Sequence, residues 1–272
     1  MGKVIAVANQ KGGVGKTTTS VNLAAALVFS GKKVLVIDID PQGNATSGCG
    51  FDKNSLEATL YDVFTGVFNL SSVIIGGELD GLWVAPANSD LVGAEVELAN
   101  SNKKEGILKK EISKLRSQFD YIFIDCPPSL NLLTINALVA SDSLLVPLQC
   151  EYYALEGVSS LMQTYQLAKK NLNKNLDLEG VVLTMYDGRT KLTKQVGKEA
   201  KDFFGEAMFN TIIPRSIKLS EAPSFGQSIF EYAPSSAGAL AYLALANELE
   251  SKQGHNQGKN KRKNKRGVRY GT

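Results

Sequence analysis

Short apolar runs rich in β-branched residues alternate with helical stretches along most of this 272-residue chain. Runs that are apolar on both faces are typical of strands buried in a parallel sheet between two layers of helices. The predicted strands are Val4–Ala8, Lys33–Ile37, Leu82–Ala85, Tyr121–Ile124, Ser143–Pro147, Gly180–Thr184 and Asn210–Ile213. The predicted helices are Lys16–Ser30, Lys103–Gln118, Leu130–Ala140, Leu155–Asn171, Leu192–Phe204 and Ser236–Glu250. This alternation predicts an α/β fold with a doubly wound, mostly parallel sheet and helices on both faces.

Charge divides the chain into two unequal parts. Residues 252–272 contain eight Lys or Arg residues and no acidic residue. Removing these eight from the 30 basic residues leaves 22 against 27 acidic residues, so residues 1–251 carry a net charge of −5 although the whole chain carries +3. We expect one globular domain over residues 1–251. We expect a basic, disordered tail over residues 252–272, because that segment is too polar to build a packed core.

The composition excludes several classes of protein. Hydrophobic residues make up 43% and charged residues 21%, which is ordinary for a globular domain. No apolar run is long enough for a transmembrane helix. The three cysteines, Cys49, Cys126 and Cys150, are widely spaced, and the single histidine is His255. A disulfide framework and a zinc site are therefore not expected, and a reducing cytoplasm fits best.

A glycine-rich loop joins the first predicted strand to the first predicted helix. It reads Asn9-Gln10-Lys11-Gly12-Gly13-Val14-Gly15-Lys16-Thr17-Thr18, and it stands in the context that a phosphate-binding loop requires. Small residues let backbone amides turn toward phosphate oxygens, and the helix N-terminus adds a favourable dipole. Lys16 would neutralise the β- and γ-phosphates, and the Thr17 hydroxyl would bind Mg²⁺.

The loop departs from the general phosphate-loop pattern at one position, where Gln10 replaces the expected glycine. The segment Lys11–Thr18 instead resembles the deviant Walker A motif of the ParA/MinD superfamily of P-loop ATPases, with Lys11 at its signature lysine. The resemblance implies a dimer that buries two ATP molecules, in which Lys11 reaches the nucleotide of the other subunit. The ATP-binding residues that it implies are Lys11, Gly12, Gly13, Val14, Gly15, Lys16, Thr17, Thr18, Pro214 and Ser216. For the last two, which match the adenine-end contacts of the family, an ordinary strand-end loop is the alternative.

Two aspartates end the second predicted strand. Side chains two positions apart on a strand share a face, and the carboxyl ends of such strands face the ligand crevice. Asp38 and Asp40 are therefore expected to approach one phosphate site. The stretch resembles the Walker A′ motif, which implies that Asp40 orients or activates the attacking water and that Asp38 lies near the metal shell. A capping role after the strand is the alternative for Asp38.

A third acidic residue follows the apolar strand Tyr121–Ile124. This arrangement is the Walker B pattern, in which Asp125 would hold Mg²⁺ through a water. The segment Cys126–Ser129 resembles the family's switch II, which senses the γ-phosphate. Cys126 is expected to be a packed hydrophobe, because no histidine is available to activate it as a nucleophile. The predicted catalytic residues are Lys11, Lys16 and Asp40. The predicted magnesium-site residues are Thr17, Asp38 and Asp125.

Further segments resemble one branch of the superfamily, the chromosomal ParA (Soj) partition proteins. They are Asp40–Gly48, Gln149–Gly157 and Leu219–Ser224, and the similarity extends over about residues 1–250. The resemblance implies a weak, Mg²⁺-dependent ATPase that forms a homodimer with ATP and then binds double-stranded DNA without sequence preference. It also implies a ParB-type (Spo0J-like) partner that stimulates hydrolysis and release, and a cytoplasmic, nucleoid-associated protein.

Basic residues near the end of the domain could supply such DNA contacts. Lysines spaced three and four apart on a predicted helix form one stripe, for which an ordinary solvated helix face is the alternative. The candidate DNA-contacting residues are Arg189, Lys191, Lys194, Lys198, Arg215 and Lys218, with Lys201 completing the stripe. Among these, Arg189 and Lys218 stand where the Soj branch places DNA contacts.

Two other functions stay open. One is a MinD-like ATPase that positions machinery at a membrane. The tail segment Lys259–Arg266 has no apolar face, so no stable membrane association is expected. The other is a regulator of replication initiation or transcription that uses nucleotide only as a switch.

Overall fold

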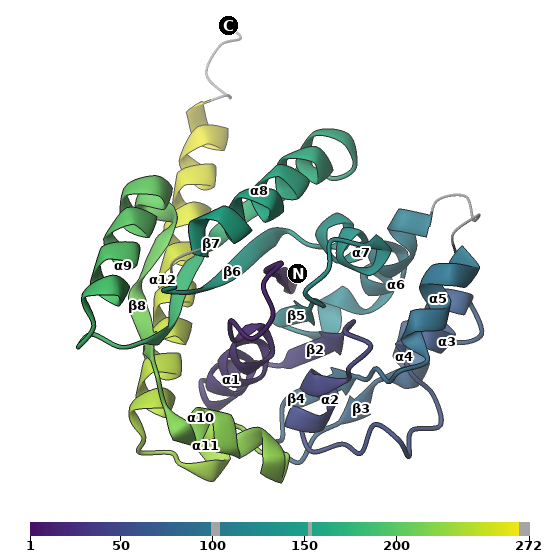
Figure 1. Ribbon diagram of the computed structural model, residues 1–272. Coiled ribbons are helices and arrows are strands. Elements are labelled where there is room, and N and C mark those ends of the chain that lie inside the picture. Colours follow the sequence, from purple (N-terminus) through teal and green to yellow (C-terminus); the bar gives the residue numbers. More distant parts are fainter. Residues whose placement is uncertain (99–103, 152–153, 267–272) are drawn as a thin grey trace, which may run out of the picture.

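The centre of the computed structural model, which describes residues 1–98, 104–151 and 154–266, is an eight-stranded sheet (Figure 1). The strand order is β3–β4–β2–β5–β1–β6–β7–β8. Every neighbouring pair is parallel except β3 and β4. The strands are β1 (Lys3–Val7), β2 (Val34–Asp38), β3 (Ile75–Gly76), β4 (Leu82–Ala85), β5 (Tyr121–Asp125), β6 (Ser143–Gln149), β7 (Asp177–Tyr186) and β8 (Met208–Pro214).

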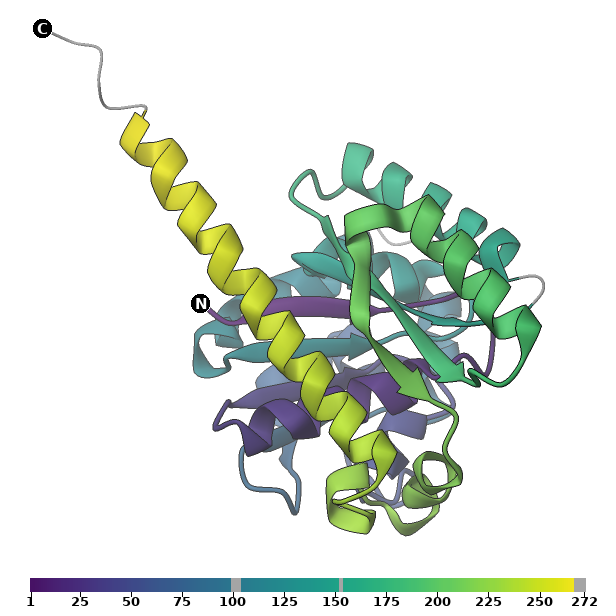
Figure 2. The same ribbon diagram turned by 90° about the vertical axis from the view of Figure 1, so that its left-hand side faces the viewer.

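Helices cover both faces of this sheet (Figures 1 and 2). The helices are α1 (Lys16–Phe29), α2 (Asn44–Gly48), α3 (Leu60–Thr65), α4 (Leu70–Val73), α5 (Leu91–Leu98), α6 (Ile107–Leu115), α7 (Leu132–Ala140), α8 (Ala154–Asn171), α9 (Lys191–Phe204), α10 (Ile217–Glu221), α11 (Ile229–Tyr232) and α12 (Ala237–Arg266). Short 3-10 turns lie at η1 (Lys104–Gly106), η2 (Arg116–Gln118), η3 (Gly205–Ala207) and η4 (Ala222–Phe225).

The sheet separates two hydrophobic cores. Alternate residues of β1 enter different cores, because side chains along a strand point to opposite faces. Ile5 packs in the core that contains residues of α1 and α12, such as Leu27 and Tyr242. Val4 packs in the core that contains residues of α6, α7 and α8, such as Leu161. The predicted doubly wound α/β fold is confirmed.

The strand order creates a crevice at the carboxyl end of the sheet. β1 lies between β5 and β6, and the chain builds outward on both sides of it. Ligand crevices of open α/β sheets form where the strand order reverses in this way. Val7 at the end of β1 is aligned with Asp125 at the end of β5, which is aligned in turn with Asp38 at the end of β2. Both carboxylates therefore meet beside the loop that follows β1.

All seven predicted strands and six predicted helices are present, with small differences at their ends except in α12, which extends well beyond its predicted end. The sequence prediction missed β3 and the short helices α2, α3, α4, α5, α10 and α11. Such elements are too short to show a hydrophobic period. In α3 the local signal was a capping box, in which the Thr59 amide donates to the Asp62 carboxylate at 2.8 Å.

The last helix extends into the segment predicted to be a tail. The helix α12 continues past the predicted end at Glu250 and extends to Arg266, so residues 252–266 have a helical backbone. Of these 15 residues nine are Lys, Arg or Gln, which are good helix formers, and none is proline, although two glycines and three asparagines weaken the helix. The segment also continues a helix whose earlier turns are anchored in the core through Tyr242, Leu245 and Leu249. Residues 267–272 lie outside the described residues, and the division at residue 252 stays a prediction.

Candidate nucleotide site

The loop between β1 and α1 has the backbone of a phosphate cradle. Gly13 and Gly15 have φ angles of 72° and 86°, in the left-handed region that favours glycine. Gly15 precedes α1 and offers no side chain to cap the amides of its first turn. Unpaired amides and the helix dipole together attract an anion. An anion held in this loop would therefore meet the N-terminus of α1, and phosphate binding at this place stays a prediction.

Two buried side chains hold this loop against the sheet. The Asn9 side-chain amide donates to the Pro147 carbonyl at 2.7 Å, and its oxygen accepts the Lys11 amide at 3.1 Å. The Thr184 hydroxyl donates to the Val14 carbonyl at 2.7 Å. The loop is thereby fixed to the ends of β6 and β7. The sequence prediction missed the anchoring roles of Asn9 and Thr184, because each acts on a segment far away along the chain.

The two lysines of the loop point to different surroundings. Lys16 is buried, and its ammonium donates to the Lys11 carbonyl at 3.2 Å, so its side chain folds back over the loop. Burial lowers the pKa of Lys16, and the nearby Asp125 opposes this shift. The Lys11 side chain is 37% exposed and forms an ion pair with Glu151, in the segment after β6. Lys16 thus lies within its own cradle, whereas Lys11 lies at the surface beside it.

Asp125 is fixed by two hydroxyl groups from α1. Thr17 donates to one carboxylate oxygen at 2.7 Å, and Ser20 donates to the other at 2.7 Å. The carboxylate is fully buried, and burial raises its pKa to about 6. Thr17 and Asp125 are thereby brought together as predicted. Ser20 was not predicted, although it lies one helical turn after Lys16.

Asp38 anchors the loop that follows β2, as in the capping role given above as its alternative. One oxygen accepts the Asp40 amide at 3.1 Å, and the other accepts both the amide and the hydroxyl of Thr46 at 2.8 Å. Burial, followed by the neighbouring Asp125, raises the pKa of Asp38 to about 8. Both oxygens are thus used to hold the loop between β2 and α2. The structure places Asp38 next to Asp125, but in the role of a loop anchor.

This anchored loop positions Asp40. The Asp40 side chain is buried at the end of β2, where one carboxylate oxygen accepts the Gln42 amide at 2.9 Å. Gly43 has a φ of 61°, and a Cβ there would lie 2.6 Å from the Ala87 carbonyl oxygen, so only glycine fits without rearrangement. The Thr46 hydroxyl also accepts the Ala87 amide at 3.0 Å. The Asp40 loop is therefore clamped between β2 and the segment after β4.

A cleft of about 250 Å³ begins at the end of the phosphate loop. Its lining includes Gly15 and Thr18 from that loop, together with Pro214 and Ser216 from the segment after β8. The structure therefore brings these late residues beside the loop, and their contact with adenine stays a prediction. Met185 also lines the cleft and has a φ of 49°, an unusual value for a residue other than glycine.

Cys126 is fully buried, and burial raises the pKa of its thiol. Its Sγ lies 3.6 Å from the Ile124 carbonyl oxygen. These surroundings agree with the predicted packing role. Among the described residues, no group of three or more His, Cys, Asp and Glu side chains could hold a metal ion by itself. In the same part of the chain, no helix is both long and apolar enough to cross a membrane.

The predicted DNA-contacting residues lie on two exposed segments. Arg189 follows β7, has a side chain 90% exposed and pairs with Asp187 at 2.7 Å. Lys218, on α10, pairs with Glu221 at 3.0 Å. Arg215 is exposed and lines the cleft beside Ser216. The remaining candidates, Lys191, Lys194 and Lys198, are exposed on α9.

Comparison with known proteins gives the relationships of this chain. A family model described as an AAA domain matches residues 2–178. The sporulation initiation inhibitor protein Soj of Bacillus subtilis is 53% identical over 249 residues, which cover 92% of this chain and 98% of that protein. The chromosome partitioning protein ParA of Myxococcus xanthus is 48% identical over 92% of this chain and 88% of its own length.

Solved structures share the fold. Cobyrinic acid a,c-diamide synthase from Mycobacterium smegmatis, with bound ATP analog and magnesium, matches with a TM-score of 0.81 and 37% identity, covering 91% of this chain and 93% of that one. The cell division ATPase MinD of Pyrococcus furiosus matches with a TM-score of 0.77 and 30% identity, covering 92% and 99%. With its deviant phosphate loop and these relatives, the chain belongs to the Soj/ParA family of chromosome-partitioning ATPases within the ParA/MinD superfamily.

Proposed function

We propose that this chain drives DNA segregation, as the ATPase of a chromosome or plasmid partition system. In the proposed cycle, two subunits close around two ATP molecules and the dimer binds double-stranded DNA without sequence preference. A ParB-type partner then stimulates hydrolysis, and the dimer opens and leaves DNA. The protein would be cytoplasmic and associated with the nucleoid.

The observation that carries this proposal is that Lys16 is buried over the phosphate loop whereas Lys11 lies at the surface. Lys16 is buried over its own phosphate loop, where it would neutralise the β- and γ-phosphates of ATP. Lys11 is partly exposed and forms an ion pair with Glu151, which is itself 47% exposed. An exposed ion pair contributes about 0–1 kcal/mol, so little free energy holds Lys11 there. It is therefore available to reach the nucleotide of a second subunit.

The residues around Asp125 fit a magnesium ion. The Thr17 hydroxyl and one Asp125 oxygen lie 2.7 Å apart and converge beside the loop. Hydroxyl, carboxylate and phosphate oxygens, with waters, are the ligands that Mg²⁺ prefers. Thr17 would bind the ion directly, and Asp125 would hold it through a water. Asp38 would lie next to Asp125, near the ligands of the ion. When bound, the ion neutralises charge on the phosphates.

Asp40 is proposed to orient the water that attacks the γ-phosphate. Catalysis of phosphoryl transfer depends mainly on positioning and on charge stabilisation. The clamped loop supplies the positioning, since Asp38 holds both ends of it through Asp40 and Thr46. Lys16 supplies charge in the same subunit, and Lys11 supplies it from the other subunit. The adenine would occupy the cleft lined by Pro214 and Ser216.

DNA binding must come from a local patch, because residues 1–251 carry −5 overall. The proposed contacts, on α9 and in the segments after β7 and β8, are Arg189, Lys191, Lys194, Lys198, Arg215 and Lys218. A dimer would double the number of phosphate contacts. With ~6–10 contacts, affinity falls by about 10³–10⁵ between 50 and 200 mM salt, so a single subunit would bind far more weakly.

The test is DNA binding at several salt concentrations with ATP, with ADP and without nucleotide. Wild type should bind random-sequence duplex in a salt-dependent manner only with ATP. Asp40→Ala should stay on DNA, because the dimer forms but does not hydrolyse ATP. Lys11→Ala should retain some nucleotide binding but neither dimerise nor bind DNA, which size-exclusion chromatography with ATP checks.

Two results would contradict the proposal. Normal turnover by Asp40→Ala would remove Asp40 from its proposed role. No DNA binding by wild type in any nucleotide state would favour a membrane-positioning ATPase, and co-sedimentation with lipid vesicles in the presence of ATP would then identify it.

A further inference from the structure

A fully buried serine on α1 contacts the carboxylate of Asp125. The Ser20 hydroxyl lies 2.7 Å from one Asp125 oxygen and 3.1 Å from the Lys16 carbonyl oxygen. A hydroxyl has a single proton to donate, and a charged carboxylate oxygen accepts it more strongly than a neutral carbonyl does. The shorter distance agrees with this order. The Ser20 proton is therefore directed at Asp125.

Ser20 and Thr17 together hold both oxygens of this carboxylate. The two residues lie three positions apart on α1, a spacing that places side chains on the same face of a helix. Thr17 is partly exposed beside the phosphate loop, whereas Ser20 is fully buried. Ser20 therefore has no surface at which to meet a nucleotide or an ion. Its hydroxyl can act on ATP hydrolysis only through the groups that it contacts.

Asp125 needs such donors because a second carboxylate lies beside it. Asp38 is aligned with Asp125 on the neighbouring strand, and both side chains are fully buried. Two buried carboxylates repel each other, and here each has donors of its own. Thr46 donates to Asp38, while Thr17 and Ser20 donate to Asp125. Each carboxylate oxygen can accept two hydrogen bonds, so a water held by Asp125 does not have to displace Ser20.

We infer that Ser20 is a positioning residue of the ATPase reaction, whose hydroxyl holds the Asp125 carboxylate in the orientation that the magnesium site requires. This inference rests on the magnesium site proposed above. Hydrogen-bond partners of the groups at a metal site orient those groups, and removing such a partner lowers metal affinity by about 10–100-fold. Since Asp125 would act through a water, we expect the lower end of this range for Ser20.

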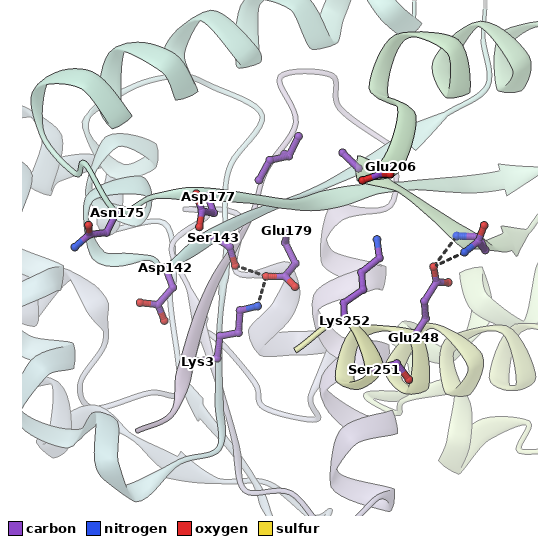
Figure 3. Close-up of a pocket in the computed structure, with 13 residues that line it drawn as sticks. Lys3, Asp142, Ser143, Asn175, Asp177, Glu179, Glu206, Glu248, Ser251 and Lys252 are labelled. Atoms are coloured by element: carbon purple, nitrogen blue, oxygen red, sulfur yellow. Dashed lines mark hydrogen bonds and ion pairs between the residues drawn. The ribbon is translucent and has the colours of Figure 1, made fainter. Parts of the chain in front are cut away.

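The opposite end of the sheet offers a matched control. In the cleft of about 570 Å³ shown in Figure 3, the Ser143 hydroxyl donates to Glu179 at 2.5 Å. Ser143 is buried, and the Glu179 side chain is only 5% exposed. This pair repeats the contact between a buried serine and a buried carboxylate near the amino ends of β6 and β7. Ser143→Ala therefore removes the same kind of hydrogen bond as Ser20→Ala, far from the phosphate loop.

The test compares wild type, Ser20→Ala and Ser143→Ala as full-length proteins. Titration with Mg²⁺ at a fixed concentration of a fluorescent ATP analogue gives the half-saturating Mg²⁺ concentration. The same analogue in EDTA gives the nucleotide affinity without the ion. Steady-state kinetics gives kcat at each Mg²⁺ concentration, and melting temperatures check that each variant is folded. Ser20→Cys, which keeps the size of the side chain but donates weakly, replaces Ser20→Ala if that variant does not fold.

Ser20→Ala should raise the half-saturating Mg²⁺ concentration about 10-fold, because Asp125 loses its fixed orientation. Its nucleotide affinity in EDTA should stay at the wild-type value. Its kcat should be low at limiting Mg²⁺ and recover toward the wild-type value at saturating Mg²⁺. Ser143→Ala should keep the wild-type half-saturating concentration.

Three results would overturn the inference. A lower melting temperature of Ser20→Ala with an unchanged half-saturating Mg²⁺ concentration would make Ser20 a purely structural residue. An equal loss of nucleotide affinity in EDTA would assign its effect to the Lys16 carbonyl and the phosphate loop. An equal shift in Ser143→Ala would assign it to general loosening of the fold.

Asp125→Asn separates this inference from the proposed magnesium site. If Asp125→Asn kept the wild-type half-saturating Mg²⁺ concentration, the proposed site and the inference would both be wrong. A shift in Asp125→Asn without one in Ser20→Ala would reject the inference alone.

Discussion

At the scale of single residues, Thr46 has a buried hydroxyl near the site that forms two hydrogen bonds. It is fully buried, donates through its hydroxyl to Asp38 and accepts the Ala87 amide. Thr46→Val keeps the shape of the side chain but removes one hydrogen bond to the Asp38 carboxylate and one from the Ala87 amide. This loss should cost about 1–3 kcal/mol of unfolding free energy. The looser loop should also lower kcat for ATP hydrolysis about 10-fold with little change in KM. Denaturant unfolding and steady-state kinetics measure the two effects.

Thr46→Ser is the matched control, because it keeps the hydroxyl. It should restore kcat to near the wild-type value. If Thr46→Val lost stability but kept its kcat, Thr46 would have a structural role and would not position Asp40.

Glu151 gives a second prediction at this scale. In the proposed dimer, its ion pair with Lys11 would have to break before Lys11 reaches the other subunit. Because the pair is partly exposed, its contribution is about 0–1 kcal/mol. Glu151→Gln should therefore strengthen ATP-dependent dimerisation by up to about 5-fold per subunit, as measured by analytical ultracentrifugation. Weaker dimerisation would show that Glu151 contributes to the dimer itself.

The sequence predicted the residues that lie within one contiguous motif. The loop Lys11–Thr18 and the acids Asp40 and Asp125 were singled out because each belongs to a short motif that can be recognised from neighbouring residues alone. Asn9 and Thr184 were missed, since their partners lie 138 and 170 positions away. Only the packing of β1 against β6 and β7 brings such groups together.

At the scale of elements, the exposed edge of β8 is closed by one carboxylate. Glu248 of α12 accepts the amides of Asn210 and Thr211, both at 2.8 Å, and also the Thr211 hydroxyl at 2.7 Å. An unpaired strand edge invites pairing with another chain. Glu248→Gln should cost roughly 1–2 kcal/mol of unfolding free energy at pH 7, because charge-assisted hydrogen bonds are lost.

The pH dependence of this effect has a definite sign. Burial alone would raise the pKa of Glu248, but the hydrogen bonds from Asn210 and Thr211 outweigh it, and the pKa is lowered. The stabilisation is therefore present above the ordinary pKa of 4.5 and is lost as the pH falls through the lower, folded value. The difference between wild type and Glu248→Gln should shrink below pH 4.5 in urea unfolding. A constant difference would mean that packing, and not charge, stabilises this edge.

Long elements were predictable and short ones were not. Strands such as β1 and β5 are continuous apolar runs, which can be recognised from the sequence without knowing which elements pack against them. The two-residue β3 has no period at all, and it exists because β4 pairs with it. The extent of α12 was underestimated for the opposite reason. The residues after Glu250 are too polar to join the core, so no helix was predicted there. A helix that Leu249 already anchors in the core can nevertheless continue through Lys, Arg and Gln residues, which favour helix.

At the scale of the whole molecule, β7 joins the phosphate loop to the proposed DNA surface. Thr184 near its end bonds Val14, and Arg189 follows shortly after. Thr184→Val should retain ATP binding but reduce the ratio of DNA affinities with and without ATP. Couplings of this kind amount to about 5–150-fold. We expect at least a 5-fold decrease of that ratio in anisotropy titrations.

Thr184→Ser, which keeps the hydroxyl, should retain the ratio. An unchanged ratio in Thr184→Val would show that nucleotide state reaches the DNA surface through dimerisation alone.

The two edge strands of the sheet affect which surfaces of this chain can associate with a second copy. One edge is the two-residue β3, and the other is β8 with Glu248 across its amides. The two-residue β3 is too short to template a neighbouring strand, and Glu248 occupies the amides of Asn210 and Thr211 on β8. Both features disfavour self-association by strand addition. In the proposed dimer the second copy meets the crevice of strand ends instead. Since that crevice holds the phosphate loop, the proposed assembly would be a readout of nucleotide occupancy.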